Sequence, residues 1–473
     1  MPPKHEFRGA WIQTAYQEEY KRMTPAQMKA DFIRKLDILE ACRINAIIFQ
    51  VRPEADAFYP SNLEPWSRFF TGTQGKAPQD GFDLMQFLIE ECHKRNMEFH
   101  AWLNPYRAGT EGSTTFAASH IIHKYPGRFV RYNKQILFDP GQPQNRRFIA
   151  NVVKDIVSRY DVDAIHLDDY FYPYPASGGI PFPDDESFKL YGQGSTPEMR
   201  NDWRRQNVNL LVSELSDVIH SVKPWVRFGI SPFGIYRNKK NTPADDPGSQ
   251  TNGLQSYDDL YADILLWLRQ GWIDYVIPQL YWEIAHPSAD YATLIRWWDQ
   301  HTFGRHLYIG QDVDRTMKAN QLAGKMQDQR QMPNAAGHSF WPANEILWNN
   351  KGVADSLKRH YHRYPALLPA YTRLQKRSPG KVKTLQSEDS EGLRLHWNAT
   401  LNPDDARSAH YFVIYRFDRK EKIDLSNPAR IIGITRQTSY RLNNQTETPA
   451  RYVVTAVNRF HNESKGVRIT IKP

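Results

Sequence analysis

Two adjacent carboxylates, Asp168 and Asp169, close the run AIHLDD, and the aromatic run YFYP follows them. Adjacent carboxylates repel each other, so one of the two is expected to have a raised pKa or a cationic partner. A third acid, Glu283, closes the run PQLYWE beside Tyr281 and Trp282, an apolar setting that favours a protonated carboxyl group. Cleavage of a glycosidic bond needs one carboxyl group to protonate the leaving oxygen and another to attack the sugar or activate water. This chemistry makes Asp168 a candidate nucleophile or base and Glu283 a candidate general acid, with Asp169 as a further catalytic candidate.

Polar and aromatic side chains recur at the ends of other apolar runs. Side chains alternate along a strand, so residues two positions apart share a face, and the polar members of each run share one face at its end. Pyranose rings stack on aromatic faces, and ligand sites combine apolar walls with a few placed polar groups. The predicted substrate-binding residues are Arg52, Glu54, His100, Trp102, Asn104, Tyr106, His166, Tyr170, Tyr172, Phe233, Tyr236, Gln279, Tyr281, Trp282, Asp312 and Trp341.

Several of these acids also have a structural interpretation. Asp168 could order the aromatic segment that follows it, and Glu283 could accept a hydrogen bond from a sugar hydroxyl or form a salt bridge at the rim. Glu54 could pair with Arg52, and Asp312 could cap the helix that follows it. The sequence leaves these alternatives open.

Metal chemistry is the competing interpretation of the same region. His5, His100 and His166, with Asp168 and Asp169, are residue types that bind metal ions. The HxH pair usual in barrel metallohydrolases does not occur on a predicted strand, so we expect His100 and His166 to act as hydrogen-bonding residues, with neither a metal nor a cofactor required. The sequence also contains no glycine-rich phosphate loop, GxSxG elbow or nucleotide fingerprint.

The elements that must position these residues alternate between strand-like and helical patterns. Eight strand-like runs, each followed by a helical stretch, predict parallel βαβ units and favour a closed (β/α)8 barrel over residues 1–370. The connections after the strands are long and those before them are short, which is typical of a barrel with its site at the carboxyl ends of the strands. The predicted strands are Phe7–Thr14, Asn45–Pro53, Glu98–Arg107, Asp163–Pro173, Arg227–Gly234, Asp274–Glu283, His306–Val313 and Gly337–Asn344.

The pattern changes after Tyr371 to short alternating strands without an evident helix. These predict a small antiparallel β-sandwich over residues 384–473, joined to the barrel by a linker at residues 371–383. The predicted strands are Leu393–Trp397, Tyr411–Phe417, Ile431–Ile434, Arg451–Asn458 and Val467–Ile471.

The net charge of +9 is concentrated in the last hundred residues, where residues 375–473 hold 18 Lys and Arg against 10 Asp and Glu. Nucleic-acid proteins gather such charge in a stripe or motif, whereas here it is scattered over strands. We therefore expect no nucleic-acid partner, and either a solvated basic face or attraction to an anionic polymer such as cell-wall material.

The two cysteines, Cys42 and Cys92, fall in predicted helices and are expected to be buried thiols, although neighbouring helices could bring them together.

The beginning of the chain, MPPKHEFRGAW, has neither an apolar core nor a cleavage site typical of a signal peptide, and no later run of about 18 apolar residues could span a bilayer. Because Met1 leads almost directly into the first strand, we hypothesise that a signal segment has been removed. The sequence does not define an oligomeric state.

Seven ordered motifs together carry a family resemblance. The motifs FRGAWIQT, NAIIFQVRPEADAFYPS, HAWLNPYRA, LFDPG, IHLDDYFYP, ISPFGIYRN and PQLYWE resemble those of glycosyl-hydrolase-like family ten over about residues 5–360. The resemblance implies a (β/α)8 barrel in a bacterial envelope protein of the periplasm or outer membrane, often with a lipid anchor. It also implies a polysaccharide partner, since members include a hydrolase of peptidoglycan glycan strands that lack stem peptides.

By motif position, the carboxylates at the strand ends of this family correspond to Asp168 and Glu283, with Arg52, Glu54, Asn104 and Asp169 around them. The C-terminal part, with Trp397 and the run TAVNRFHNES, is similar to a fibronectin type III module, for which spacing or wall adhesion is expected.

These observations favour a hydrolase of a bacterial envelope polysaccharide, acting through carboxylates. A noncatalytic glycan-binding barrel and a metal-assisted hydrolase or deacetylase are the alternatives.

Overall fold

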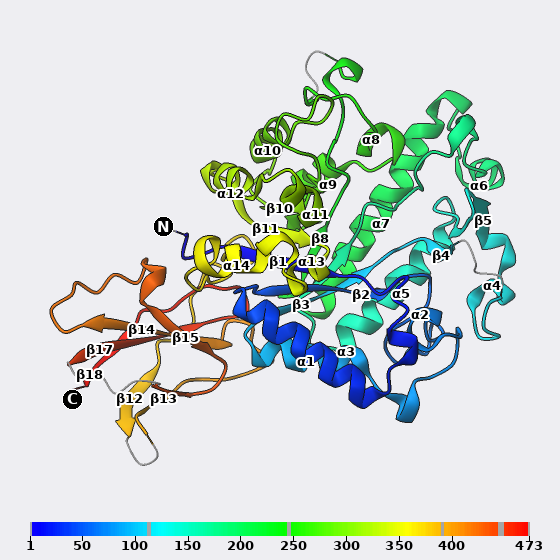
Figure 1. The fold of residues 1–473 in the computed structure, drawn as a ribbon. Coiled ribbons are helices and arrows are strands. Elements are labelled where there is room, and N and C mark those ends of the chain that lie inside the picture. The colour runs from blue at the N-terminus through cyan, green and yellow to red at the C-terminus, as the bar shows by residue number, and fades with distance from the viewer. Residues whose placement is uncertain (1, 111–114, 244–246, 389–391, 443–448, 472–473) are drawn as a thin grey trace.

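The first part of the chain forms a closed barrel of parallel strands (Figure 1). The computed structural model describes residues 2–110, 115–243, 247–388, 392–442 and 449–471. The barrel strands are β1 (Phe7–Ile12), β2 (Ala46–Arg52), β3 (Glu98–Leu103), β7 (Ala164–Leu167), β8 (Arg227–Ile230), β9 (Tyr275–Val276), β10 (His306–Asp312) and β11 (Ala335–Trp341). They pair in this order, and β11 closes the ring on β1. The predicted barrel is confirmed, and each strand lies in or overlaps a predicted run.

Helices surround the barrel and cover its strands. The first of them, α1, begins where the sequence indicates, because Thr24 and Gln27 form a reciprocal capping box and Pro25 occupies the first turn. Its buried face then packs inward through Phe32 and Leu36. The helices are α1 (Pro25–Ala41), α2 (Arg68–Thr71), α3 (Leu84–Lys94), α4 (Ile121–Lys124), α5 (Pro143–Arg159), α6 (Asp185–Tyr191), α7 (Arg200–Val222), α8 (Ser256–Asp259), α9 (Ile264–Gln270), α10 (Tyr291–Gln300), α11 (Val313–Lys318), α12 (Leu322–Gln331), α13 (Ala343–Leu347) and α14 (Val353–Ser356).

The connection after β3 carries a small sheet of its own. Its antiparallel strands are β4 (Arg107–Gly109), β5 (Phe129–Tyr132) and β6 (Gln135–Phe138), in the order β4-β6-β5. The connection therefore adds ordered structure beside the carboxyl ends of the strands.

The barrel strands are shorter than the sequence predicts, and β7 and β9 differ most from their predicted runs. β7 ends at Leu167 and β9 ends at Val276, whereas the predicted runs continue to Pro173 and Glu283. Pro278 has no N–H for a sheet ladder, and the amide of Leu280 donates to the carbonyl of Pro278 in a tight turn. The two-residue alternation assumed for the predicted run therefore does not extend to Glu283.

The inside of the barrel is a packed core rich in aromatic side chains. Phe7 and Tyr308 stack with ring centroids 4.0 Å apart, and Tyr275 lies 5.5 Å from Tyr308. All three side chains are fully buried. The space between strands is therefore filled, and a ligand can enter only at an end of the barrel.

The second part of the chain consists of two antiparallel sheets, drawn at the left of Figure 1. Their strands are β12 (Lys383–Glu388), β13 (Arg394–Asn398), β14 (Tyr411–Asp418), β15 (Ile431–Thr435), β16 (Ser439–Arg441), β17 (Ala450–Val457) and β18 (Val467–Ile471), in the orders β12-β13-β16 and β15-β14-β17-β18. Trp397 packs edge-on against Phe412 in the core between them. The sequence analysis missed β12 and β16, because most of their side chains are polar and at least partly exposed and form no apolar run.

These sheets pack against the end of the barrel where the strands begin. Arg459 pairs with Asp161 at 2.9 Å, just before β7, and His461 hydrogen-bonds to Glu98 at 2.7 Å, at the start of β3. Tyr371, at the beginning of the predicted linker, is itself buried against the barrel. The C-terminal sheets therefore lie opposite the carboxyl ends of the strands.

Cys42 and Cys92 are both buried free thiols. Burial raises the pKa of Cys42 to about 11, so this thiol stays protonated at neutral pH. In the part of the chain that the structure describes, no helix combines the length and the apolar character needed to cross a membrane.

Candidate active site

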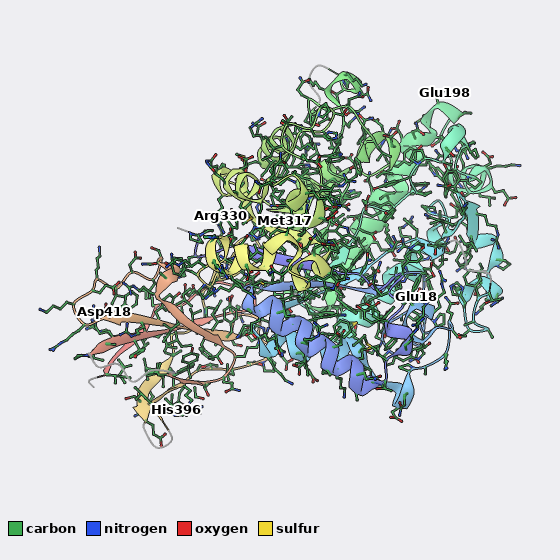
Figure 2. The ribbon with its side chains drawn as sticks, in the orientation of Figure 1. Glu18, Glu198, Met317, Arg330, His396 and Asp418 are labelled. Carbon is green, nitrogen blue, oxygen red and sulfur yellow. The ribbon has the colours of Figure 1, made fainter. Side chains whose placement is uncertain are left out.

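A pocket of about 270 Å³ opens at the carboxyl ends of the barrel strands. In Figure 2, Glu18 and Glu198, from the connections after β1 and β7, lie on the side of the barrel away from His396 and Asp418 of the C-terminal sheets. The described residues that line the pocket are Trp11, Gln13, Ala15, Tyr16, Gln50, Trp102, Arg107, Asp168, Asp169, Tyr170, Ser231, Gln279, Tyr281 and Trp341. A larger hollow of about 350 Å³ lies outside the barrel near the start of α1, but no carboxylate is among the described residues that line it.

Asp168 follows β7 directly and is held by two donors from β3 and its end. Trp102 Nε1 donates to Asp168 Oδ2 at 3.0 Å, and Asn104 Nδ2 donates to Asp168 Oδ1 at 3.1 Å. Burial raises the pKa of Asp168 to about 6, the charge of Asp169 adds to this effect, and the guanidinium of Arg107 opposes it. The carboxyl group therefore titrates close to neutral pH, as expected for a proton donor or acceptor in catalysis.

Asp169 lies beside Asp168 with different partners. Tyr174 donates its hydroxyl hydrogen to Asp169 Oδ2, and Gln279 Nε2 donates to Asp169 Oδ1 at 3.0 Å. Burial raises the pKa of Asp169, while the hydrogen bonds from Tyr174 and Gln279 oppose the rise. Gln279 also donates to the carbonyl of Ser231 at 2.9 Å, which ties the ends of β8 and β9 to this acid.

Aromatic rings form the walls of the pocket. Trp102 and Trp341 meet edge to face with centroids 6.0 Å apart, and Arg107 lies over the ring of Tyr170 at 5.7 Å. Tyr16 is 58% exposed and Tyr170 is 37% exposed, so their rings are available to a ligand. Flat and partly exposed faces beside buried carboxylates suit a sugar ring.

The pocket brings together only part of the predicted set. Asp168 and Asp169 line it, as do the predicted binding residues Trp102, Tyr170, Gln279, Tyr281 and Trp341. Asn104 contributes through its hydrogen bond to Asp168.

Several side chains at the pocket are absent from the predicted set, namely Trp11, Gln13, Tyr16, Gln50, Arg107, Tyr174 and Ser231. Arg107 and Ser231 follow strand ends within the motifs HAWLNPYRA and ISPFGIYRN, and this position is the signal that could have identified them.

Arg52 and Glu54 each form an ion pair with another residue, and not with each other. Arg52 forms a buried ion pair with Glu64, with Nη2 to Oε1 at 2.6 Å, and it also donates to the carbonyl of Asn104. Glu54 binds Arg68 at 2.8 Å. The alternative of an Arg52–Glu54 pair is therefore wrong, and both residues support the loops around the pocket.

Other predicted residues lie in the core or at the rim. Tyr106, Tyr172 and Tyr236 are buried among apolar side chains. Trp282 packs edge-on against Phe233, with centroids 5.4 Å apart. None of these five is among the described residues that line the pocket.

Glu283 and Asp312 also lie outside the described pocket lining. Asp312 caps α11 by accepting a hydrogen bond from the amide of Arg315 at 2.9 Å, as one alternative expected. Glu283 lies close enough to Lys325 to act on its charge. Burial lowers the pKa of Lys325 to about 8, and Glu283 and Asp312 oppose this decrease.

His100 and His166 lie deeper in the barrel than the pocket acids and are fully buried. Burial and the neighbouring His100 lower the pKa of His166 well below its ordinary value, so His166 is neutral.

Among the described residues, one group of three potential metal ligands occurs, formed by Glu6, His338 and His362. It contains no residue of the pocket.

A parallel barrel that presents two buried carboxylates among aromatic rings at its strand ends is typical of the class of barrel enzymes that act on glycans. Within this class, the family model for Glycosyl hydrolase-like 10 matches residues 6–328, and the chain belongs to this family. The protein is accordingly a glycoside hydrolase.

Two relatives agree with this assignment, and a solved structure has a similar fold. The chain is 37% identical to Glycosyl hydrolase YngK of Bacillus subtilis (strain 168), over 99% of this chain and 93% of the relative. It is 36% identical to Glycosyl hydrolase DigH of Escherichia coli (strain K12), over 62% of this chain and 69% of the relative. The glycoside hydrolase domain of PgaB (BpsB) from Bordetella bronchiseptica superposes with a TM-score of 0.51 and 11% identity, covering 75% of this chain and 98% of that domain. This last likeness concerns the fold alone.

Proposed function

We propose that the protein hydrolyses the glycan strands of bacterial peptidoglycan after their stem peptides have been removed. The family resemblance motivates this substrate, and the shape of the site supports it. The pocket is small, at about 270 Å³, and is walled by Trp11, Trp102 and Trp341. A sugar ring without a bulky peptide branch suits such a space better than a substituted one.

The observation that carries the proposal is the environment of Asp168. Its pKa of about 6 leaves roughly a tenth of the carboxyl groups protonated at pH 7, far more than an ordinary aspartate. In the proposed reaction Asp168 delivers its proton to the leaving glycosidic oxygen as the glycosidic bond breaks, a role that the sequence analysis gave to Glu283. A water molecule then bonds to the anomeric carbon and returns a proton to Asp168. Asp169 acts in its ionised form, which accepts hydrogen bonds from Tyr174 and Gln279, and stabilises positive charge that develops on the sugar.

Binding energy comes from the surrounding side chains. Tyr16, Tyr170 and Tyr281 offer aromatic faces or hydroxyl groups around the mouth, and stacking on them would hold the chain of sugars across the barrel. Arg107 lies close enough to lower the pKa of Asp168, so it tunes the acid as well as forming part of the wall.

The experiment is a comparison of substrates with a matched pair of variants. The protein is incubated with amidase-treated peptidoglycan, intact peptidoglycan and plain polysaccharides, and released fragments are identified by mass spectrometry. Asp168→Asn should abolish release, whereas Asp312→Asn, which alters a strand-end acid outside the described lining, should retain it. Release from intact peptidoglycan at an equal rate, or from plain polysaccharides alone, would contradict the proposed substrate.

We propose that the C-terminal sheets form a fibronectin type III-like module that holds the enzyme against the anionic cell wall. We also propose that the protein belongs to the bacterial envelope and that its precursor carries a lipid anchor. Its exposed Arg419, Lys420 and Lys422 support attraction to anionic polymers. Replacing these three residues by Glu should weaken co-sedimentation with insoluble walls and leave cleavage of soluble glycan unchanged. Unaltered co-sedimentation at low salt would remove the support for adhesion.

A further inference from the structure

A chain of hydrogen bonds runs through the middle of the barrel from the floor of the pocket to the opposite end. Trp11 Nε1 lies 3.4 Å from His166 Nε2, and His166 Nδ1 lies 3.1 Å from the hydroxyl of Tyr275. The same hydroxyl lies 2.8 Å from His100 Nδ1, and His100 Nε2 lies 2.9 Å from Glu98 Oε2. All five side chains are buried.

The two ends of this chain determine the direction of every hydrogen bond in it. The indole of Trp11 can only donate, so His166 Nε2 accepts and His166 Nδ1–H donates to the oxygen of Tyr275. The carboxylate of Glu98 can only accept, so His100 Nε2–H donates to it and His100 Nδ1 accepts from the Tyr275 hydroxyl. Each histidine therefore has one assigned tautomer, and the tyrosine hydroxyl links the two.

The lower end of the chain is held by the C-terminal sheets. Arg227 forms an ion pair with Glu98, and His461, which follows β17, donates from Nε2 to Glu98 Oε1 at 2.7 Å. Burial opposes the charge of Glu98, but Arg227 and His461 hold its pKa well below the ordinary value. The hydroxyl of Tyr411 from β14 lies 3.3 Å from His461 Nδ1 and orients that ring. The C-terminal part thus keeps Glu98 ionised and in place.

The upper end of the chain reaches the catalytic acids. Ser231 Oγ lies 3.1 Å from His166 Nε2, and the carbonyl of Ser231 accepts from Gln279, which also donates to Asp169. Trp11 and Ser231 line the pocket. A change in the tautomer of His166 would place an N–H against the indole N–H of Trp11, and Ser231 Oγ would then accept a hydrogen bond from His166.

From these contacts we infer that the chain from His461 through Glu98, His100, Tyr275 and His166 positions the floor of the active site, so that the C-terminal sheets take part in catalysis at a distance. None of these five residues is among the described residues that line the pocket. They act through other side chains and are therefore positioning residues. The inference rests on the proposed use of the pocket for glycan cleavage, but its structural core, the tautomer of His166, can be measured without any substrate.

The alternative is that these side chains simply fill the barrel with satisfied polar groups. The barrel offers a matched pair of variants that separates the two. Tyr275→Phe removes the central hydroxyl and keeps the ring. Tyr308→Phe removes the hydroxyl of a neighbouring, equally buried tyrosine that bonds to His306 and Tyr371 and lies outside the chain.

The tautomers are read from nitrogen chemical shifts of the full-length protein labelled with ¹⁵N-histidine, and kcat and KM are measured on the glycan that the wild type cleaves. We expect His166 to carry its proton on Nδ1 in the wild type and in Tyr308→Phe, and to lose this preference in Tyr275→Phe. We expect Tyr275→Phe to lower kcat by roughly 10- to 100-fold, the range that small misplacement of reacting groups produces, with little change in KM.

A second pair of variants tests the contribution of the C-terminal sheets. His461→Ala should lower kcat in the same manner, and His461→Gln, which retains an N–H donor, should restore most of it. His396→Ala, at a partly exposed site of the same sheets, serves as the control.

The inference would be overturned if Tyr275→Phe kept the His166 tautomer and the kcat of the wild type, or if both tyrosine variants lowered kcat equally. Loss of kcat in His461→Ala without rescue by His461→Gln would also count against it. Absence of cleavage by the wild type would instead refute the proposed function and leave the tautomer measurement to decide the inference.

Discussion

The hydrogen bond from Trp102 to Asp168 predicts a defined change in the pH dependence of cleavage. Trp102 Nε1 donates to Asp168 Oδ2 at 3.0 Å, and Trp102→Phe removes this donor while keeping an aromatic wall. A hydrogen bond to a charged group contributes about 1.5–3 kcal/mol, and about 1.36 kcal/mol corresponds to one pKa unit. The substitution should therefore raise the pKa of Asp168 from about 6 to roughly 7–8.

The assay is the dependence of kcat/KM on pH, which reports the pKa values of essential groups in the free enzyme. If Asp168 acts as the acid, the alkaline limb of the profile should move to higher pH in Trp102→Phe. If Asp168 acts as the base, the acidic limb should move instead. Trp341→Phe is the control, because Trp341 lines the same pocket and Asp168 accepts its side-chain hydrogen bonds from Trp102 and Asn104.

Neither limb moving in Trp102→Phe would show that Asp168 does not control the rate. An equal movement in Trp102→Phe and Trp341→Phe would show that the pocket wall, and not the hydrogen bond, sets the pKa. Either result would refute the reasoning that assigns the central role to Asp168.

Three further predictions follow from the same geometry. Burial raises the pKa of Asp168 above its unfolded value, so the stability associated with its proton is complete below about pH 4 and is lost as the pH rises through about 6. The free energy of unfolding of Asp168→Asn, measured by urea titration, should therefore exceed that of the wild type by about 1–3 kcal/mol at pH 8 and not at pH 4. Arg52→Ala should cost about 3–5 kcal/mol in the same assay, because it leaves the Glu64 charge buried without its partner, and a loss below that of Arg68→Ala would contradict this. Glu283→Gln should keep cleavage activity, and EDTA should leave it unchanged, since Trp, Asn, Tyr and Gln donors hold the pocket acids; inactivation in either test would restore Glu283 or a metal to the mechanism.

Much of the fold could be predicted because its signals are local. The strand and helix patterns alternate eight times, and Thr24, Pro25 and Gln27 indicate the start of α1. β12 and β16 were missed because exposed strands carry no apolar run.

The site was predictable where its residues lie at a strand end or directly after it. Asp168, one residue beyond β7, and Trp102, within β3, are in this group. The prediction lost accuracy where the backbone departs from strand geometry, as it does at Pro278, before Glu283. Alternation is a property of extended backbone, and a turn ends it.

The sequence by itself determined the class of fold and predicted Asp168 and Asp169 at the carboxyl ends of the barrel strands, because apolar periodicity and strand-end positions are read along the chain. Only the tertiary structure decided the partners of those acids. Tyr174 with Asp169, Arg52 with Glu64 and His461 with Glu98 are contacts between residues separated by 5, 12 and 363 positions. Hydrogen bonds and ion pairs depend on distances of about 3 Å, and spacing along the sequence does not set such distances once the chain leaves a regular element.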